Sequence, residues 1–311
     1  MFSRFETLEN FSKKDQKQLE SSKIAVVGLG ATGSVIAEHL ARHRVELVLI
    51  DRDYLEPKDI YSSSIYKPGQ CENAIPKAVA AQKELENFTK IKSKVESLNP
   101  ENIELLEDVD LILDGTDNLE TRFLINEYSK KENIPWIYTA AIGQEGYSML
   151  FDKKCFNCVF EKVGAGSLET CETAGILREV STIAGSLSAQ KAVKYLTGKT
   201  VLETLHKVSG EEFEVENRGC KVCEDRKYNS IGSNRSTVAL CGKNKYQLEV
   251  EVSENGLKRL KHTGDIIADN EYLLRVCLDG LEITVFNSGR IILEARDKGH
   301  AETVVSEILG V

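Results

Sequence analysis

The chain has 311 residues, of which 41% are hydrophobic and 29% are charged, enough for one large or two modest hydrophobic cores. Its formal net charge of −9 argues against a surface that binds nucleic acid or anionic lipid. No apolar run approaches the roughly 20 residues that span a bilayer, and the first 23 residues lack the apolar segment of a signal peptide. We therefore expect a cytoplasmic protein without a membrane or nucleic-acid partner. Its eight cysteines are then metal ligands, nucleophiles or core residues rather than disulfides.

The first strong pattern is the glycine-rich turn of residues 24–33, Ile-Ala-Val-Val-Gly-Leu-Gly-Ala-Thr-Gly, which joins an apolar strand to a helix. Gly28 permits a sharp turn, Gly30 lets the backbone approach a phosphate, and Gly33 lets the helix pack on the strand. Free N–H groups and the positive end of the helix dipole favour an anion there. The pattern predicts a nucleotide site; the alternative is a tight turn that needs glycine for its backbone alone.

Strand and helix patterns then alternate as far as residue 140. Strands are expected at 24–28, 46–50, 91–95, 111–114 and 135–138, with helices near 76–88 and 118–131. This alternation predicts an α/β fold with a Rossmann-like, doubly wound, mostly parallel sheet. Ligands of such sheets bind beyond the carboxyl ends of the strands. Asp51, which can accept hydrogen bonds from ribose hydroxyls, and the segment 115–118 (Gly-Thr-Asp-Asn) should therefore open onto the same crevice as the glycine turn.

Residues 52–76 form a long connection without a clear period, which is typical of a functional or a disordered segment. It leads to Lys77 at the start of a helix. A lysine there is a candidate phosphate ligand. A solvated lysine at a helix start is the plainer alternative, and spacing alone favours it.

After residue 140 the alternation weakens. We expect a strand at 147–151, a loop at 160–172, a helical stretch at 173–197 interrupted at Gly185, and short strands at 201–208 and 212–216. A Ser-, Asn- and Gly-rich stretch at 227–236 indicates a linker. Beyond it, strand runs at 237–241, 271–277, 282–286 and 290–294 and a helix at 300–309 predict a small α+β domain. The expected domains are residues 1–228 and 229–311.

Two Cys-x-x-Cys pairs, Cys155 with Cys158 and Cys220 with Cys223, can present four thiolates tetrahedrally to one zinc ion. The 61 residues between the pairs exceed a compact zinc finger, so the ion would join distant segments. A closed four-sulfur site has no open position, which predicts a structural role; the alternative is two unrelated buried pairs. Cys171 precedes a helix and is either a nucleophile with a lowered pKa or an inert buried thiol.

Taken in chain order, these motifs resemble those of the ThiF/MoeB/HesA adenylyltransferases, relatives of the ubiquitin-activating enzymes. The resemblance covers roughly residues 1–226. The motifs that carry it are Gly28–Gly33, Asp51-Arg-Asp53, Pro76-Lys77, Leu113-Asp-Gly-Thr-Asp-Asn118, the two cysteine pairs and Cys171-Glu-Thr-Ala-Gly175.

The resemblance implies that ATP and Mg2+ bind together with the C-terminal Gly-Gly tail of a ubiquitin-like sulfur-carrier protein. The tail carboxylate attacks the α-phosphate to give an acyl-adenylate and pyrophosphate. Asp51 then corresponds to the ribose acceptor, Lys77 to the cation that neutralises phosphate charge, and Asp117 to the acid that organises Mg-ATP. The residues that the resemblance places at the nucleotide are Gly28, Gly30, Ala31, Gly33, Asp51, Asp53, Lys77, Asp117 and Asn118.

The resemblance also implies a homodimer, because Arg4 corresponds to an arginine that enters the partner subunit's site. Cys171 matches a cysteine that bonds covalently with the carrier in some members, through a thioester or persulfide. The C-terminal domain is too short for a typical rhodanese domain, so a sulfur donor would act in trans.

The chain departs from the family pattern at one position. The family usually has Asn-x-x-Arg after the second acid, whereas this chain has Asp59-Ile-Tyr-Ser62. Loss of an arginine that contacts phosphate can cost on the order of 10³-fold in rate. The candidate replacements are Arg4, Lys58, Lys67 and Lys77.

Three other functions compete with adenylation of a carrier protein. The departure at Ser62 favours a catalytically weak or inactive scaffold that binds a ubiquitin-like protein. A nicotinamide-linked dehydrogenase would explain the glycine turn but neither the Asp117 motif nor the cysteine pairs. Adenylation of a non-protein substrate such as tRNA is disfavoured by the acidic composition.

Overall fold

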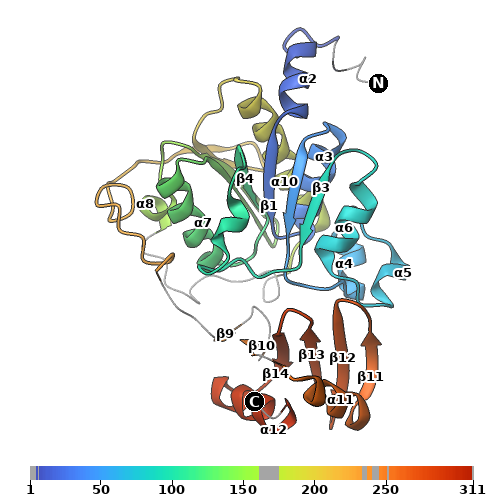
Figure 1. Cartoon of the computed structure of the whole chain (residues 1–311). Coiled ribbons are helices and arrows are strands. Elements are labelled where there is room, and N and C mark those ends of the chain that lie inside the picture. Colours follow the sequence, from blue (N-terminus) through green and yellow to red (C-terminus); the bar gives the residue numbers. More distant parts are fainter. Residues whose placement is uncertain are drawn as a thin grey trace. The chain divides into compact units, whose positions relative to one another are not determined.

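The computed structural model describes residues 5, 7–160, 175–232, 237–239, 245–250 and 252–309. The chain forms two compact units (Figure 1). The first comprises Met1–Pro68 and Pro76–Ser233, and the second comprises Gly69–Ile75 and Asn234–Val311. None of the described helices combines the length and the apolar character that crossing a membrane requires.

An eight-stranded sheet forms the centre of the first unit, with the strand order β3-β2-β1-β4-β5-β6-β7-β8. The pairs from β3 through β5 are parallel, and the pairs from β5 through β8 are antiparallel. The strands are β1 (Lys23–Val27), β2 (Glu46–Ile50), β3 (Ile91–Lys94), β4 (Leu111–Asp114), β5 (Trp136–Ile142), β6 (Glu145–Phe151), β7 (Thr204–Lys207) and β8 (Glu212–Glu214). The predicted mostly parallel α/β sheet is confirmed.

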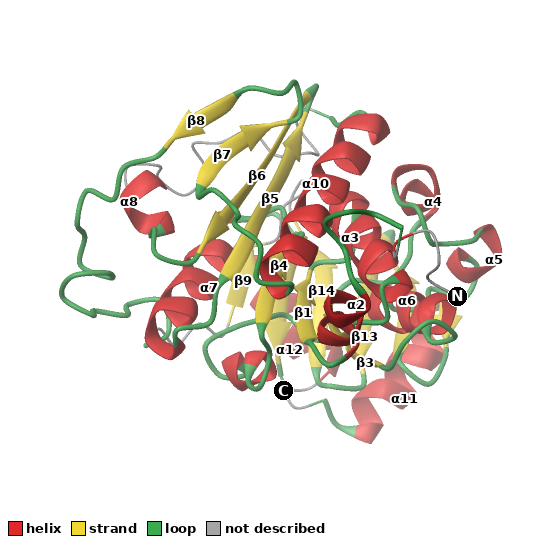
Figure 2. Cartoon of the chain, turned by 90° about the horizontal axis from the view of Figure 1, so that it is seen from above, coloured by secondary structure: helices red, strands yellow, loops and turns green. Residues whose placement is uncertain are grey.

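Helices cover both faces of this sheet. Helices α3 (Ala31–Arg42), α6 (Lys77–Leu85) and α10 (Arg178–Leu196) lie on one face, and α7 (Leu119–Glu132) and α8 (Phe156–Phe160) lie on the other (Figure 2). The strands β1, β2 and β4 are almost fully buried because they contribute alternate residues to the two layers. The remaining helices of this part of the chain are α2 (Lys13–Glu20), α4 (Pro57–Ser62), the short α5 (Pro68–Cys71) and the 3-10 helix η1 (Ile103–Leu106).

Helix α10 is continuous from Arg178 to Leu196, so the predicted interruption at Gly185 is wrong. Glycine serves packing there rather than a break. A Cβ atom at Gly185 would lie 2.8 Å from the backbone oxygen of Thr32 and 2.9 Å from the Val35 side chain. Gly185 therefore lets α10 approach the first turns of α3 at backbone distance.

The second unit contains an antiparallel sheet with the order β11-β12-β13-β14-β10-β9. Its strands are β9 (Thr237–Ala239), β10 (Lys245–Glu249), β11 (Asp265–Asp269), β12 (Leu273–Leu278), β13 (Leu281–Phe286) and β14 (Arg290–Glu294), and its helices are α11 (Glu254–Thr263) and α12 (Lys298–Leu309). Leu260, Val276, Ile291 and Ala301 are fully buried in its core. The sequence prediction missed β10, α11 and β11, whose short runs carry many exposed charges.

Candidate nucleotide site and cysteine cluster

The glycine turn is shaped by the close approach of Gly28 and Gly33 to each other and to Gly115 in the loop after β4. Gly28 has a φ of +83°, and a Cβ atom there would lie 2.8 Å from the carbonyl of Gly115. A Cβ atom at Gly33 would lie 1.9 Å from the oxygen of Gly28. By contrast, a Cβ atom at Gly30 would meet nothing within 4 Å. Gly28 and Gly33 are thus required by close packing, whereas Gly30, the N-cap of α3, borders open space where a ligand can approach the helix start.

Asp51 follows β2, the strand next to β1, and its side chain binds the glycine turn that follows β1. Its carboxylate accepts hydrogen bonds from the backbone N–H of Leu29, at 2.6 Å, and of Asp53, at 2.7 Å. Burial, together with the negative charge of Asp53, raises the pKa of Asp51 to about 6, although Lys77 and the two N–H donors oppose the shift. The carboxylate is therefore ionised at neutral pH and tied to the glycine turn.

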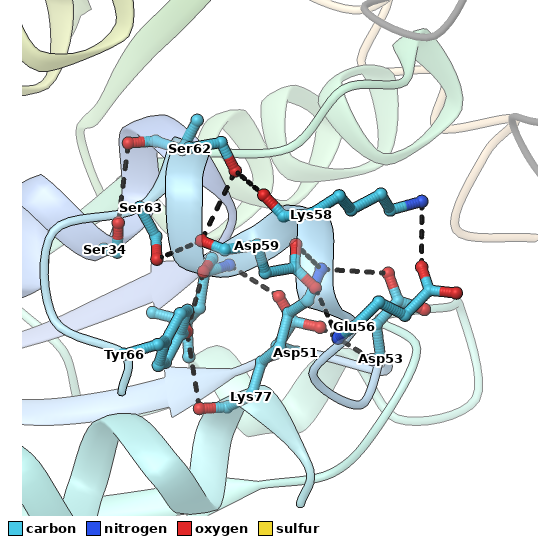
Figure 3. Close-up of polar contacts among 12 residues, drawn as sticks. Ser34, Asp51, Asp53, Glu56, Lys58, Asp59, Ser62, Ser63, Tyr66 and Lys77 are labelled. Atoms are coloured by element: carbon cyan, nitrogen blue, oxygen red, sulfur yellow. Dashed lines mark hydrogen bonds and ion pairs between the residues drawn. The ribbon is translucent and has the colours of Figure 1, made fainter. Parts of the chain in front are cut away.

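Lys77 begins α6 and is almost fully buried, unlike a solvated lysine at a helix start. Its ammonium nitrogen lies 3.0 Å from Asp59 Oδ1 and 4.0 Å from Asp53 Oδ2 (Figure 3). Burial disfavours the charged ammonium, but the charges of Asp53, Asp51 and Asp59 outweigh it, so the pKa of Lys77 is raised. Lys77 is a permanent cation within a group of carboxylates.

Asp59 was missed as a site residue because residues 52–76 lack a period. It lies in the first turn of α4, where its Oδ2 accepts from the backbone N–H of Glu56 at 2.8 Å in a capping box. Glu56-Pro57-Lys-Asp59, with proline at the helix start and an acid in the first turn, is the signal that identifies this helix. The buried hydroxyl of Tyr66 donates to the Leu29 carbonyl at 2.7 Å, which ties the same connection to the glycine turn.

The loop after β4 is shaped by a buried ion pair that the sequence did not reveal. Asp114 Oδ2 lies 2.9 Å from Arg122 Nε, and Asp114 Oδ1 accepts from the Thr116 backbone at 2.9 Å. Burial raises the pKa of Asp114, while Arg122 and the Thr116 donors oppose that shift. Asp117, next in the loop, is exposed. Asn118 is the N-cap of α7 and accepts from Thr121 N at 2.8 Å.

The fold brings most of the predicted residues to one edge of the sheet. The glycine turn follows β1, Asp51 and Asp53 follow β2, and the loop with Asp117 follows β4; Lys77 is bound through its backbone N–H to the Asp53 carbonyl at 2.8 Å. Within unit 1, these are the carboxyl ends of parallel strands. Arg4 and Cys171 lie outside the described residues.

The position of the missing arginine holds a serine bound to its own helix. The Ser62 hydroxyl donates to the backbone oxygens of Lys58, at 3.2 Å, and Asp59, at 3.5 Å. Lys58 extends toward Glu56, 2.8 Å from its carboxylate, and away from Lys77 (Figure 3). Lys67 pairs with Glu84. Both candidate lysines thus have carboxylate partners of their own.

The four cysteines of the two Cys-x-x-Cys motifs converge, with all their sulfur atoms within 4.8 Å of one another. Cys155 lies 3.8 Å from Cys220, and Cys158 lies 3.6 Å from Cys223. A tetrahedron with Zn–S bonds of about 2.3 Å has S···S edges of about 3.8 Å, so the cluster fits zinc. Asn126 supports it from α7 by donating to Cys155 Sγ at 3.3 Å and accepting from Phe156 N at 3.0 Å.

Several known proteins are similar to this chain in sequence. The model of the ThiF family matches residues 2–229. The sulfur carrier protein ThiS adenylyltransferase of Bacillus subtilis strain 168 is 28% identical, and the alignment covers 99% of each chain. The maize protein adenylyltransferase and sulfurtransferase MOCS3-1 is 30% identical over 63% of this chain and 44% of its own length. The SAMP-activating enzyme E1 of Haloferax volcanii is 28% identical over 63% of this chain and 74% of its own.

Solved structures show the same fold at low sequence identity. E. coli MccB with MccA-N7isoASN superposes with a TM-score of 0.58 at 17% identity, covering 67% of this chain and 69% of that chain. E. coli MccB with ATP gives a TM-score of 0.57 at 16% identity and covers 68% of each chain.

Proposed function

Because the chain belongs to the ThiF family, we propose that it uses ATP to adenylate the C-terminal Gly-Gly carboxylate of a ubiquitin-like sulfur-carrier protein. The observation that carries the proposal is the convergence of the glycine turn, Asp51, Lys77 and the Asp117 loop at the carboxyl edge of the sheet. Of the relatives named above, one is an adenylyltransferase of the sulfur carrier protein ThiS and another is a SAMP-activating enzyme E1, which supports this class of substrate.

Each residue has a distinct task in the proposed reaction. Asp51, ionised at neutral pH, accepts hydrogen bonds from the ribose. The phosphates lie along the open side of Gly30 at the start of α3, with the Lys77 ammonium as their neighbour. The exposed carboxylate of Asp117 would hold Mg2+, which supplies neutralisation of phosphate charge.

The chemistry needs no proton transfer. A carboxylate oxygen of the carrier tail forms a bond to the α-phosphorus while the bond from that phosphorus to the bridging oxygen of the β-phosphate breaks. The products are the acyl-adenylate and pyrophosphate, and the total charge is unchanged. The protein contributes positioning of the two anions and stabilisation of the charge that develops on the leaving group.

Several parts of the proposal extend beyond the site itself. We propose a homodimer in which Arg4 enters the partner's site, a structural zinc ion on the four cysteines, and a sulfur donor in trans. We propose that the Cys171 thiolate attacks the acyl carbon of the adenylate, forming a thioester with the carrier tail as AMP leaves. The dimer, the sulfur donor and the role of Cys171 stay predictions from the resemblance, whereas the zinc ion is predicted from the cysteine spacing and supported by the convergence of the four sulfur atoms.

Pyrophosphate exchange into ATP tests the proposal. The assay uses each small β-grasp protein of the same genome that ends in Gly-Gly, with the same carrier lacking that dipeptide as a control. We expect exchange only with the intact tail, and a loss of at least about 10²-fold in Asp117→Ala at unchanged thermal stability, because this side chain is exposed. Absence of exchange with every carrier would contradict the proposal.

The competing proposal is a scaffold that binds the carrier without catalysis, and Ser62 is the observation that favours it, since its hydroxyl is turned to backbone carbonyls. ATP affinity and carrier affinity, measured beside exchange, separate the two proposals. Carrier binding without adenylate formation would favour the scaffold.

A further inference from the structure

The nucleotide edge is rich in negative charge, and two of its cations, Lys77 and Arg52, already have carboxylate partners. Asp51, Asp53 and Asp59 surround Lys77. Arg52, the next cation, has its Nε 3.7 Å from Asp53 Oδ1. ATP with one Mg2+ brings about two further net negative charges, and these increase as the pyrophosphate departs. A cation free of such partners is therefore needed at this edge.

Helix α10 places such a cation at the nucleotide edge. Residues 175–177 run beside Gly143, the residue after β5: Gly143 N donates to the Gly175 oxygen at 2.8 Å, and Leu177 N donates to the Gly143 oxygen at 3.1 Å. Strand β5 is parallel to β4, so this contact places the start of α10 at the carboxyl edge of the sheet. The first residue of α10 is Arg178, which is exposed.

The Arg178 guanidinium reaches across this edge to the segment that follows α4. Its Nη2 lies 3.5 Å from the backbone oxygen of Ser63. In the described part of the chain it has no carboxylate partner, in contrast to Lys58, Lys67 and Lys77. A long hydrogen bond to one carbonyl leaves most of its five N–H donors available to an anion.

The same segment lies against the helix that receives the phosphates. Ser64 N donates to the hydroxyl of Ser34 at 3.4 Å, and Ser34 lies in the first turn of α3. Arg178 thus contacts Ser63, and the next residue, Ser64, bonds to the first turn of α3. Ser62, where the family usually has arginine, is adjacent to the carbonyl that Arg178 contacts.

We propose that Arg178 binds the phosphate groups of ATP and stabilises the departing pyrophosphate, in the role that an arginine at position 62 would have. The inference rests on the proposed adenylation. The planar guanidinium can contact two phosphate oxygens at once, which a lysine cannot do.

Binding measurements test the contact without any need for turnover. Calorimetry compares ATP·Mg with adenosine for the wild type, Arg178→Ala and Lys194→Ala, an exposed cation in the last turn of the same helix. We expect the Kd for ATP to rise at least about tenfold in Arg178→Ala with the Kd for adenosine unchanged, and both to stay unchanged in Lys194→Ala. An unchanged Kd for ATP, or a parallel loss of adenosine binding, would overturn the proposal.

Exchange assays then test the step itself. We expect kcat/KM for carrier-dependent pyrophosphate exchange to fall about 10²- to 10³-fold in Arg178→Ala, and the double variant Ser62→Arg/Arg178→Ala to recover at least tenfold. A double variant as slow as Arg178→Ala would overturn the shared role. If the wild type showed no exchange but its affinity for ATP still depended on Arg178, the adenylation of a carrier would be refuted. The contact between Arg178 and the phosphates would then still be supported.

Discussion

Asp51 illustrates how one carboxylate serves both the fold and the ligand. Its two oxygens bind the backbone N–H groups of Leu29 and Asp53, so it fixes the path of the glycine turn before any ribose is present. Burial raises its pKa, which brings its titration close to the physiological range. The affinity of the site for the nucleoside should therefore depend on pH.

The raised pKa of Asp51 leads us to expect that adenosine binds more weakly in acid. A carboxyl with a pKa of about 6 is ionised above that pH and protonated below it, so the ribose acceptor is lost as the pH falls through 6. We expect the Kd for adenosine, which does not titrate in this range, to rise about fourfold between pH 7.5 and 5.5. Asp51→Asn provides the control, since an amide does not titrate and should give a flat profile. A wild-type Kd that is equal at both pH values would contradict the assignment.

Lys77 shows the limit of reading a single residue from its neighbours in sequence. Its place at a helix start favours a solvated side chain, whereas the fold buries it among carboxylates from the connection after β2. The resemblance gave it a phosphate-binding role, and its burial and charge are compatible with that role. Its partner Asp59 was not predicted.

The packing of α10 on α3 connects the two sides of the nucleotide edge. Gly185 brings the helix backbones together, and seven residues earlier the same helix begins beside Gly143 with Arg178. The position of the Arg178 side chain therefore depends on a helix contact made elsewhere along α10.

Gly185→Ala should destabilise the protein, although alanine favours a helix over glycine by about 1 kcal/mol. The added Cβ atom would lie 2.8 Å from the Thr32 oxygen, so α10 must move away from α3. We expect a net loss of about 1–3 kcal/mol in the free energy of unfolding, measured by urea denaturation. Gln190→Ala, at an exposed position of the same helix, should change little. If Gly185→Ala raised the free energy of unfolding, the packing of α10 on α3 at this position would be too loose to require glycine.

The cysteine cluster joins the segment after β6 to the segment after β8, which closes a large loop of the chain. Cys155 and Cys220 are buried and 3.8 Å apart although 65 residues separate them in sequence. Binding of a metal there stabilises the folded state, because the unfolded chain does not hold the four thiolates together.

Cys220→Ser should release zinc and lower the melting temperature by at least about 5 °C, since each kcal/mol shifts a unit of this size by roughly 2–4 °C. Elemental analysis should find about one zinc ion per wild-type chain and far less in the variant. Cys277→Ser, which removes a thiol of the second unit, is the matched control and should retain the metal. Wild-type protein without zinc would disprove the assignment.

The end of the first unit lies a few residues beyond the boundary proposed from composition. Glu127 on α7 is 3% exposed and accepts from Ser230 N at 2.7 Å, Ser230 Oγ at 3.0 Å and Ile231 N at 3.2 Å. Burial raises the pKa of Glu127, and these donors oppose the shift. The segment just after residue 228 therefore contributes to the first unit.

A chain that ends at Ser233 should be more stable than one that ends at Tyr228. The shorter chain leaves the Glu127 carboxylate without its Ser230 and Ile231 donors, which costs about 1–3 kcal/mol. Urea denaturation measures the free energy of unfolding of each truncated chain. Glu127→Gln, introduced into both chains, tests whether the Glu127 carboxylate causes the difference between them, because the substitution should make that difference smaller. Equal stability of the two truncated chains would contradict this assignment.

The sequence by itself determined the features that depend on local pattern: the strand–turn–helix around Gly28, the alternation that makes the sheet mostly parallel, and the cysteine pairs. These follow from steric limits on glycine, from hydrophobic period and from ligand spacing, all of which act within a few residues. The tertiary structure alone decided that Asp59 pairs with Lys77, that Arg122 neutralises Asp114, and that Arg178 reaches Ser63. Those contacts join elements far apart in the chain, so they exist only once the helices have packed on the sheet.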